Sequence, residues 1–422
     1  MTEGLPIAEV VVTPIAFPDP PLLNSAGVHQ PWALRTIVEV HTRDGIVGLG
    51  ETYGDAGHLA LVRRAAAAAA GLDVFDLAGL RRRVADAVGV VDEPDRHGLT
   101  GPSTPAKTLL RVFSPLEVGC LDAQGQAIGR PVYDLLGGRV RDRVPFSAYL
   151  FYKWGAHPGA EPDEWGEALD PDAIVAQARR MIDRYGFGSI KLKGGVFPPE
   201  QEIAAIRALR AAFPDHPLRL DPNAAWTVDT SVRVAQETDG LLEYLEDPTP
   251  GIPGMAEVAA RAPMPLATNM CVVGYADIPE AFARGAVGVV LSDHHYWGGL
   301  RSSARLAAVC ETWDVGLSMH SNSHLGISLA AMVHVGAATP NLTYAADTHT
   351  PWQCGVDVVE QPLVFEAGAV AVPDAPGLGV TLDRDALARM HEDYQRCGIR
   401  ERDDTAYMQR VDPAYSKRLP RW

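Results

Sequence analysis

The chain has 422 residues, of which 47% are hydrophobic and 21% are charged, a composition that excludes wholesale disorder. At about 150 residues per domain, this length predicts two to three domains. The 37 lysines and arginines against 53 aspartates and glutamates give a net charge of −16, which argues against binding to nucleic acid or to anionic membranes.

The first 140 residues predict an α+β domain. Its expected strands are 7–15, 34–42 and 46–51, and Asp44-Gly45 is the hairpin turn between the last two. Its expected helices are 59–72, 76–87 and 114–127. For the third helix, Ser114 is the expected cap and Pro115 the expected first helical residue.

Residues 141–375 alternate short apolar strands with amphipathic helices. The expected strands are 145–150, 189–192, 218–220, 242–245, 265–268, 288–292, 316–319 and 342–346. The clearest helices are 171–185, 199–212, 228–238, 278–284 and 299–312. Strands joined by helical crossovers predict a (β/α) barrel, and the lack of a G-x-G-x-x-G motif after the first strands disfavours dinucleotide binding. Residues 376–422, with a helix at 383–395, are expected to pack back against the N-terminal domain.

A polar residue closes nearly every predicted barrel strand, and from Lys193 onward these residues recur every 23 to 28 positions. That spacing is one strand-helix unit, and barrel active sites lie at the carboxyl ends of the strands. The set comprises Lys191, Lys193, Asp221, Glu246, Asn269, Asp293, His320 and Asp347.

Asp221, Glu246 and Asn269 end three successive strands and offer only oxygen ligands for a metal. Hard oxygen donors suit Mg²⁺. Each residue alone could be a helix cap or a turn residue, but three of them in register favour a magnesium site.

Lys191 and Lys193 are two residues apart on one strand, so their side chains share a face. Two neighbouring ammonium groups should lower each other's pKa and allow one to act as a base. The alternative is a pair of surface lysines.

Asp293 and His320 end neighbouring strands, and a carboxylate that holds an imidazole gives a catalytic dyad. A base on each side of a bound carbon, with a metal on the substrate carboxylate, suits removal of a proton α to that carboxylate. His324 and His334 are expected to be structural, whereas for His294 and His295 a place in the pocket is left open.

Five scattered cysteines without a C-x-x-C pair predict reduced thiols in a cytoplasmic protein. Residues 1–21 lack the pattern of a signal peptide, and the longest apolar block, 65–70, is too short to span a bilayer. A serine or cysteine nucleophile has little support, because G-x-S-x-G is absent and no cysteine has an obvious base partner.

Several stretches resemble the enolase superfamily and, within it, the glucarate dehydratases. They are FGSIKLKGG at 187–195, LDPNAAW at 220–226, LEDP at 245–248, ATNM at 267–270, MHSNSH at 319–324, DTH at 347–349 and GIRERDD at 398–404. The likeness extends from Asn24 to Arg402. It departs at His294, where the family usually has proline, in the acidic stretch 161–167, and in residues 90–110, which match poorly.

The resemblance implies a modified TIM barrel, (β/α)₇β, with an N-terminal α+β capping domain completed by the C-terminal segment. It implies Mg²⁺ on Asp221, Glu246 and Asn269. Lys193 would be the base on one face, with Lys191 supporting the enolate charge. His320, paired with Asp293, would be the base on the other face and the acid that assists loss of the β-hydroxyl.

The substrate contacts that the resemblance implies are Asn24, His29, Tyr149, Lys191, Ser321, Asn322, Asp347, His349 and Arg402. In the poorly matching region, Ser103 or Thr104 is a further candidate contact. The implied reaction is dehydration of D-glucarate or L-idarate to 5-dehydro-4-deoxy-D-glucarate by a homo-oligomer. The alternatives are a dehydratase or epimerase for another aldarate or aldonate, and a non-catalytic acid-sugar binding protein. Bases on both faces argue against binding alone. The net charge does not exclude a small dicarboxylate, because lysines and a divalent cation can dominate the field inside a pocket.

Overall fold

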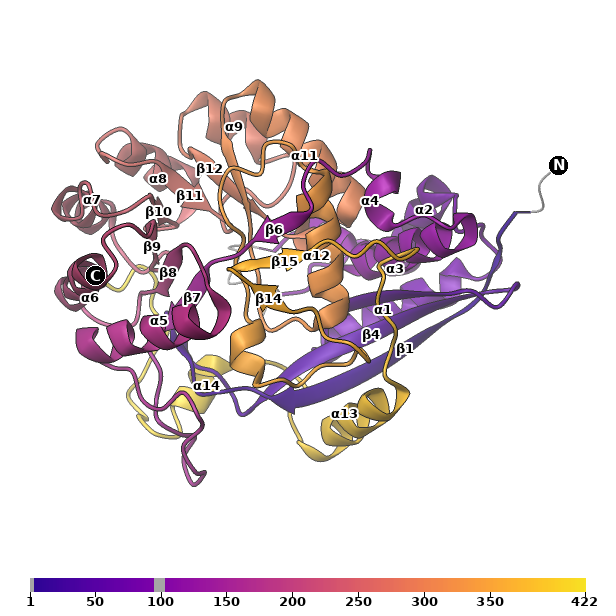
Figure 1. The fold of residues 1–422 in the computed structure, drawn as a ribbon, viewed down its shortest axis with the longest axis horizontal. Helices are drawn as coiled ribbons and strands as arrows, with labels where there is room; N and C mark the ends of the chain where they lie inside the picture. The colour runs from indigo at the N-terminus through magenta and orange to yellow at the C-terminus, as the bar shows by residue number, and fades with distance from the viewer. Residues whose placement is uncertain (1–3, 95–102) are drawn as a thin grey trace.

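The computed structural model describes residues 4–94 and 103–422. Figure 1 shows an antiparallel sheet with its helices beside a curled parallel sheet that helices surround. This is the expected fold: an N-terminal capping domain of antiparallel strands joined to an α/β barrel. In the described part of the chain, no helix combines the length and the apolar character needed to cross a bilayer.

The capping domain is built on three antiparallel strands in the order β1-β4-β5. They are β1 (Ile7–Pro18), β4 (Trp32–Thr42) and β5 (Val47–Tyr53). Between β1 and β4 lies a short hairpin of β2 (Leu23–Asn24) and β3 (Gly27–Val28). The helices are α1 (Ala56–Ala69), α2 (Leu77–Val88), α3 (Pro105–Ile128) and the short α4 (Val132–Leu135).

The expected start of α3 at Ser114 is wrong. The helix begins at Pro105, with Thr104 as its cap, and it continues through Pro115. It lies so close to β5 that a β-carbon on Gly50 would collide with the backbone of Pro115. This tertiary packing keeps the helix intact despite the hydrogen bond that proline cannot make. Instead of capping, the Ser114 hydroxyl donates to the carbonyl of His294, 2.8 Å away.

The barrel sheet is parallel and runs in sequence order from β7 to β13. Its strands are β7 (Ala148–Phe151), β8 (Ile190–Lys193), β9 (Leu218–Asp221), β10 (Tyr244–Glu246), β11 (Leu266–Thr268), β12 (Val289–Ser292) and β13 (Gly316–Met319). The surrounding helices are α5 (Pro171–Tyr185), α6 (Pro199–Ala212), α7 (Val228–Glu237), α8 (Gly251–Ala259), α9 (Ile278–Ala283), α11 (Leu300–Thr312) and α12 (Gly326–Ala338), with the short α10 (His294–Trp297) after β12.

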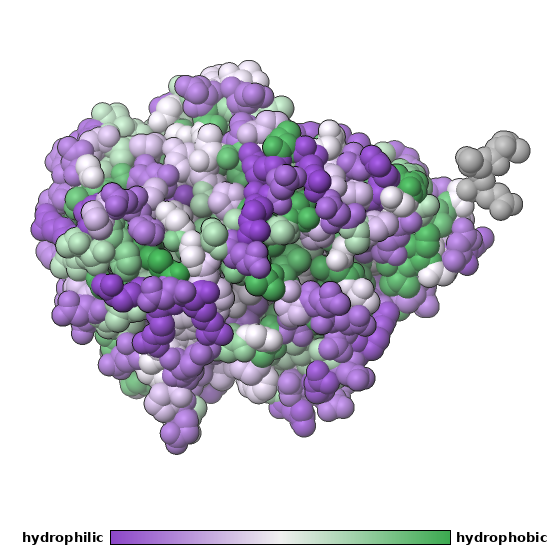
Figure 2. Space-filling view, in the orientation of Figure 1, coloured by the Kyte–Doolittle hydropathy of each residue, from purple (hydrophilic) through white to green (hydrophobic). Residues whose placement is uncertain are grey.

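Helix α5 illustrates why these segments become amphipathic helices around the sheet. Asp170 caps its first turn, and Ile174, Ala178 and Met181 are buried at helical spacing. Arg179 and Arg180 lie on its exposed side, and the face over α5 is strongly hydrophilic in Figure 2.

The eighth expected strand, 342–346, is reduced to isolated bridges. Leu342 pairs with Leu317 of β13, and Ala346 pairs with Phe146, which precedes β7. This segment therefore joins the two edges of the parallel sheet and closes the barrel. The expected strand 145–150 is divided into β6 (Arg143–Pro145) and β7, because β6 leaves the barrel to pair with β15 (Ala369–Ala371) next to β14 (Phe365–Glu366).

The C-terminal segment returns to the capping domain, as expected. Helix α13 (Arg384–Arg396) packs on β1, and α14 (Asp404–Met408) packs beside β3. The last residue lies beside α7, where the Trp422 carbonyl accepts a hydrogen bond from Thr227 N–H (Figure 1). A 3₁₀ turn, Thr350–Gln353, follows the segment that closes the barrel.

Candidate active site

A pocket lies at the carboxyl ends of the barrel strands. It is lined by Asn24, His29, Tyr149, Phe151, Lys193, His320, Ser321, Asn322, His349 and Arg402. The barrel supplies most of these residues, while Asn24, His29 and Arg402 come from the N-terminal hairpin region and the C-terminal segment. Seven of the residues expected to bind substrate thus meet in one place, whereas Ser103, Lys191 and Asp347 do not line the pocket.

The lysine side of the site consists of Lys191, Lys193, Asp221, Glu246, Asn269 and Asp347. Lys193 Nζ lies 2.6 Å from Asp221 Oδ2. Lys191 Nζ lies 2.7 Å from both Asp347 Oδ2 and Glu246 Oε2. Lys191 and Asp347 are fully buried and lie outside the residues that line the pocket, so they act on the site through their charge.

The expected lowering of the pKa is wrong for Lys191. Burial lowers the pKa of this lysine, but the neighbouring carboxylates of Asp347 and Glu246 outweigh burial and raise it well above its usual value. Lys191 therefore stays an ammonium ion near neutral pH.

The pKa values of two carboxyl groups at the strand ends, Asp221 and Glu246, shift in opposite directions. Burial raises the pKa of Asp221, but Lys193 and Lys191 outweigh it and lower the pKa to about 2. Burial, reinforced by the charge of Asp221, raises the pKa of Glu246 well above its usual value despite Lys191. Glu246 is thus a buried carboxylate that lacks sufficient positive charge around it.

Asp221, Glu246 and Asn269 fit a hard divalent cation. Among the described residues, neither the oxygen nor the nitrogen of the buried Asn269 amide has a hydrogen-bond partner. Its backbone is held in place, because Asn269 N–H donates to Asp247 Oδ2 at 2.8 Å. An unpaired amide oxygen at the end of the strand next to the one that carries the under-compensated carboxylate of Glu246 belongs to the donor set that a magnesium ion satisfies.

The histidine side of the site consists of Asp293, His295, His320, Arg35 and Glu51. His320 Nδ1 lies 3.0 Å from Asp293 Oδ2, which brings the predicted dyad together. Burial raises the pKa of Asp293, but the adjacent His295 and His320 outweigh it and lower the pKa well below its usual value. Asp293 is therefore a permanent carboxylate that can orient His320.

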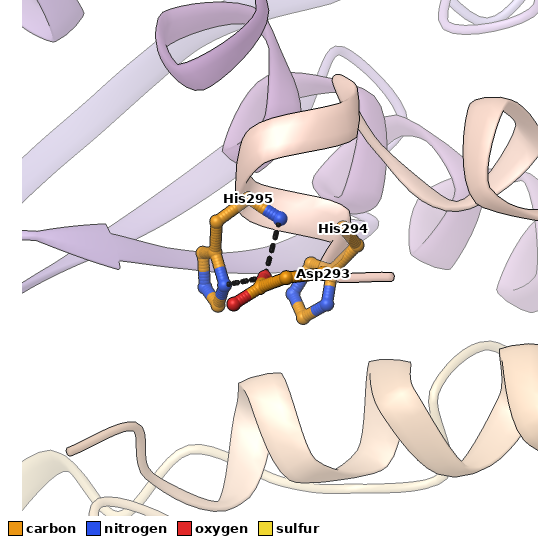
Figure 3. Close-up of side chains that lie close together, drawn as sticks. All are labelled: Asp293, His294 and His295. Carbon is orange, nitrogen blue, oxygen red and sulfur yellow. Dashed lines mark hydrogen bonds and ion pairs between the residues drawn. The ribbon is translucent and has the colours of Figure 1, made fainter. Parts of the chain in front are cut away.

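His295, left open by the sequence, contacts Asp293 directly. Figure 3 shows the Asp293 carboxylate beside both histidines, with hydrogen bonds to the backbone and ring of His295. Asp293, His294 and His295 bring three ligand atoms within 4.8 Å of one another. Both ring nitrogens of His295 are engaged, and the Arg35 guanidinium lies 3.0 Å from one of them. This cluster is therefore a hydrogen-bond network rather than a cation site.

The other expected histidines differ in position. His324 precedes α12 rather than lying in it, and burial lowers its pKa to about 3. His334 lies inside α12 between Tyr133 N–H and the Leu378 carbonyl, which is a structural role. Burial lowers the pKa of His349 well below its usual value, so this imidazole is neutral in the pocket.

Ser103 lies away from the pocket. Its hydroxyl donates to the Glu93 carbonyl at 2.7 Å and accepts from Arg111. Residues 95–102 of the poorly matching region are outside the described part of the chain.

Sequence reasoning missed residues that support the pocket from behind. Asp404 accepts hydrogen bonds from Arg402 Nη2 at 2.7 Å and Asn24 Nδ2 at 2.8 Å. Glu202 accepts from three consecutive backbone N–H groups, at 195–197, that follow Lys193. Phe151, which lines the pocket, was also missed. The sequence did carry a signal for it, because Phe151 lies two residues after Tyr149 on one strand and the two side chains therefore share a face.

Comparisons with known proteins agree with this geometry. A family model described as "Enolase C-terminal domain-like" matches residues 173–386. The chain is 57% identical to a probable glucarate dehydratase of Streptomyces coelicolor, over 100% of both chains.

Two solved structures share the fold over their whole length. An enolase from Thermobispora bispora, complexed with magnesium and formate, is 67% identical with a TM-score of 0.97, covering 99% of this chain and 100% of that one. An enolase from Pseudomonas fluorescens with bound magnesium, potassium and tartrate is 50% identical with a TM-score of 0.96, covering 100% of both. The chain therefore belongs to the enolase superfamily, with a barrel domain of the mandelate racemase and muconate lactonizing enzyme type.

Proposed function

We propose that the protein is a Mg²⁺-dependent acid-sugar dehydratase that converts D-glucarate or L-idarate into 5-dehydro-4-deoxy-D-glucarate. The observation that carries the proposal is one pocket with two candidate bases, Lys193 from β8 and His320 after β13. Identity to a probable glucarate dehydratase over the whole chain supports the choice of substrate.

Asp221, Glu246 and Asn269 would hold the magnesium ion. When bound, it supplies positive charge against the substrate carboxylate and so makes the α-proton easier to remove. The permanently charged Lys191 adds to this field from the buried side. The positive charge that stabilises the negative charge developing on the substrate carboxylate is thus in place before the reaction begins.

The residues of the chain then divide the proton transfers. Lys193 or His320, depending on the epimer, takes the α-proton. The bond from the β-carbon to its hydroxyl breaks, and His320 gives the hydroxyl a proton so that it leaves as water. The resulting enol becomes the keto acid by proton transfer to carbon. Arg402, with its Nε and Nη2 held by Asp404, would bind the distal carboxylate.

Two bases around one carbon also fit epimerisation, in which one removes the proton and the other returns one. The deciding experiment incubates purified protein and Mg²⁺ with a library of acid sugars and follows keto-acid formation. Turnover of glucarate or idarate is expected. Turnover of another aldarate alone would overturn the substrate, and release of an epimer without keto acid would overturn the dehydration.

A separate experiment tests the roles assigned to the two bases, Lys193 and His320. His320→Asn should abolish dehydration but leave exchange of the α-proton of one epimer in D₂O, because Lys193 remains. Lys193→Met should remove that exchange. Undiminished dehydration by H320N would contradict the assigned role of the dyad.

A further inference from the structure

We propose that His295 and Arg35 are positioning residues for the base His320. Arg35, supplied by the capping domain, fixes the tautomer of His295, and His295 in turn fixes the carboxylate of Asp293 that orients His320. This inference rests on the dehydratase function proposed above and adds the means by which the two domains set up its catalytic base.

The first link is the Asp293 carboxylate, whose two oxygens are both occupied. Oδ2 faces His320 Nδ1 at 3.0 Å. Oδ1 accepts from the backbone N–H of His295 at 2.9 Å and faces His295 Nδ1 at 2.7 Å (Figure 3). Rotation of the carboxylate would break hydrogen bonds on both sides, so His320 has a fixed partner.

The second link decides which nitrogen of His295 carries the proton. His295 Nε2 lies 3.0 Å from Arg35 Nη2. Ser328 Oγ also lies 3.0 Å from Nε2, but a hydroxyl can donate or accept and so does not decide the tautomer. A guanidinium group only donates hydrogen bonds, so Arg35 favours Nε2 as the acceptor. With Nε2 as the acceptor, the ring proton is on Nδ1, where it donates to Asp293. The opposite tautomer would turn a nitrogen lone pair toward the carboxylate and an N–H toward the guanidinium.

The third link anchors Arg35. Its Nε donates to Glu51 Oε1 at 2.8 Å. Glu51 also accepts from the backbone N–H groups of Leu325 and Ser328, at 2.8 and 2.9 Å. Arg35 lies on β4 and Glu51 on β5, so two capping-domain strands fix a histidine of the barrel. All of these side chains are buried, which strengthens each hydrogen bond.

The test compares two reactions of the same protein: dehydration, which needs His320, and α-proton exchange in D₂O, which needs only Lys193. His295→Leu removes the donor to Asp293. We expect dehydration to fall by roughly 10- to 100-fold, the usual effect of losing a group that orients a reactive one. Exchange through Lys193 should stay within about twofold.

His295→Asn supplies the rescue. Its amide nitrogen lies near the position of Nδ1 and always donates, so it needs no arginine to set a tautomer. Dehydration should return to within a few-fold of the wild-type rate. His334→Gln is the matched control, because His334 is equally buried but bonds only to Tyr133 and Leu378. It should leave the ratio of the two reactions unchanged.

Equal loss of both reactions in H295L, or an H295N variant no better than H295L, would overturn the proposal. A second measurement is independent of activity. In protein labelled with ¹⁵N-histidine, the resonances of His295, assigned by their loss in H295N, should show the proton on Nδ1. Arg35→Lys keeps a charge for Glu51 but has no second arm for His295, and the Nε2–H form should then gain population.

A wild-type spectrum with the proton on Nε2 would also overturn the proposal. If the wild-type protein neither dehydrates nor exchanges any acid sugar, the proposed function fails. The tautomer measurement still decides the link between Arg35 and His295, so the two failures are distinguishable.

Discussion

All residues of the lysine side of the pocket come from the barrel, whereas on the histidine side residues of the capping domain form hydrogen bonds to the barrel. On the lysine side the contacts are ion pairs, such as Lys193 with Asp221, and an amide at Asn269 stays unpaired among the described residues. On the histidine side directed hydrogen bonds run from Glu51 through Arg35 and His295 to Asp293. The lysine side carries the residues of the proposed magnesium site, whereas the hydrogen bonds of the histidine side join groups of both domains.

The largest expected effect concerns the lysine side. Glu246→Gln removes a proposed magnesium ligand, and a catalytic metal contributes several kcal/mol to the transition state. We expect kcat to fall by at least about a thousandfold. Mg²⁺ should also raise the unfolding free energy of the wild-type protein, by about 2.7 kcal/mol at a hundredfold excess over Kd, but not that of E246Q. Calorimetry and keto-acid assays measure the two effects.

Glu257→Gln makes the same chemical change on the exposed face of α8 and should alter neither quantity. Retention of full activity and of the magnesium-dependent stabilisation by E246Q would remove Glu246 from the metal site.

The second prediction tests how the capping domain docks beside the histidine side. Glu117 of α3 accepts from Leu300 and Arg301 N–H, at 2.9 and 3.1 Å, where α11 begins. Burial raises the pKa of this carboxyl from 4.5 to about 7. The folded state therefore holds the proton more tightly than the unfolded state, so the stability from this group falls as pH rises from 4.5 through 7.

The contribution of Glu117 to this fall is about 3 kcal/mol, and Glu117→Gln should reduce the total pH dependence of stability by that amount. Urea unfolding at pH 5 and pH 8 gives the difference for each variant. Glu311→Gln, on the exposed side of α11, should keep the wild-type dependence. An E117Q variant with an unchanged slope would show that Glu117 is not the titrating group.

The smallest effect concerns the rim of the pocket. Asp404→Asn weakens the hydrogen bonds that hold Arg402, and loss of a charged hydrogen bond costs about 2 kcal/mol. KM should rise by roughly 30-fold, with little change in kcat, because Arg402 is proposed to bind the distal carboxylate and not the reacting carbon. Steady-state kinetics measure both parameters.

Asp403→Asn is the matched control, because Asp403 caps α14 at its Ala406 N–H and asparagine caps equally well. A fall in kcat with unchanged KM in D404N would instead assign Asp404 to the chemical step.

The sequence could predict the strand-end residues because a barrel repeats one strand-helix unit and places every strand end on the same rim. It could not predict α3, since Ser114-Pro115 carries a local cap signal that packing against β5 overrides. The same holds for the eighth strand, whose pairing depends on both edges of the sheet.

The supporting residues were beyond sequence reasoning for another reason. Arg35 and His295 are 260 positions apart, and Asn24 and Asp404 are 380 apart. No periodicity links such positions, and each residue alone has an ordinary structural explanation. The domain boundaries after 140 and 375, the homo-oligomeric state and the cytoplasmic location stay predictions.

The origin of the pocket residues has a consequence for how this protein could diverge. Asn24, His29 and Arg402 reach the pocket from outside the barrel strands, on segments that carry none of the proposed magnesium ligands. Substitutions in these segments can alter which acid sugar fits, while the proton-transfer groups of the barrel stay untouched. Asn24 and Arg402 share Asp404 as a hydrogen-bond partner, so substitutions at these positions are coupled. A change of substrate would therefore require matched substitutions in both segments.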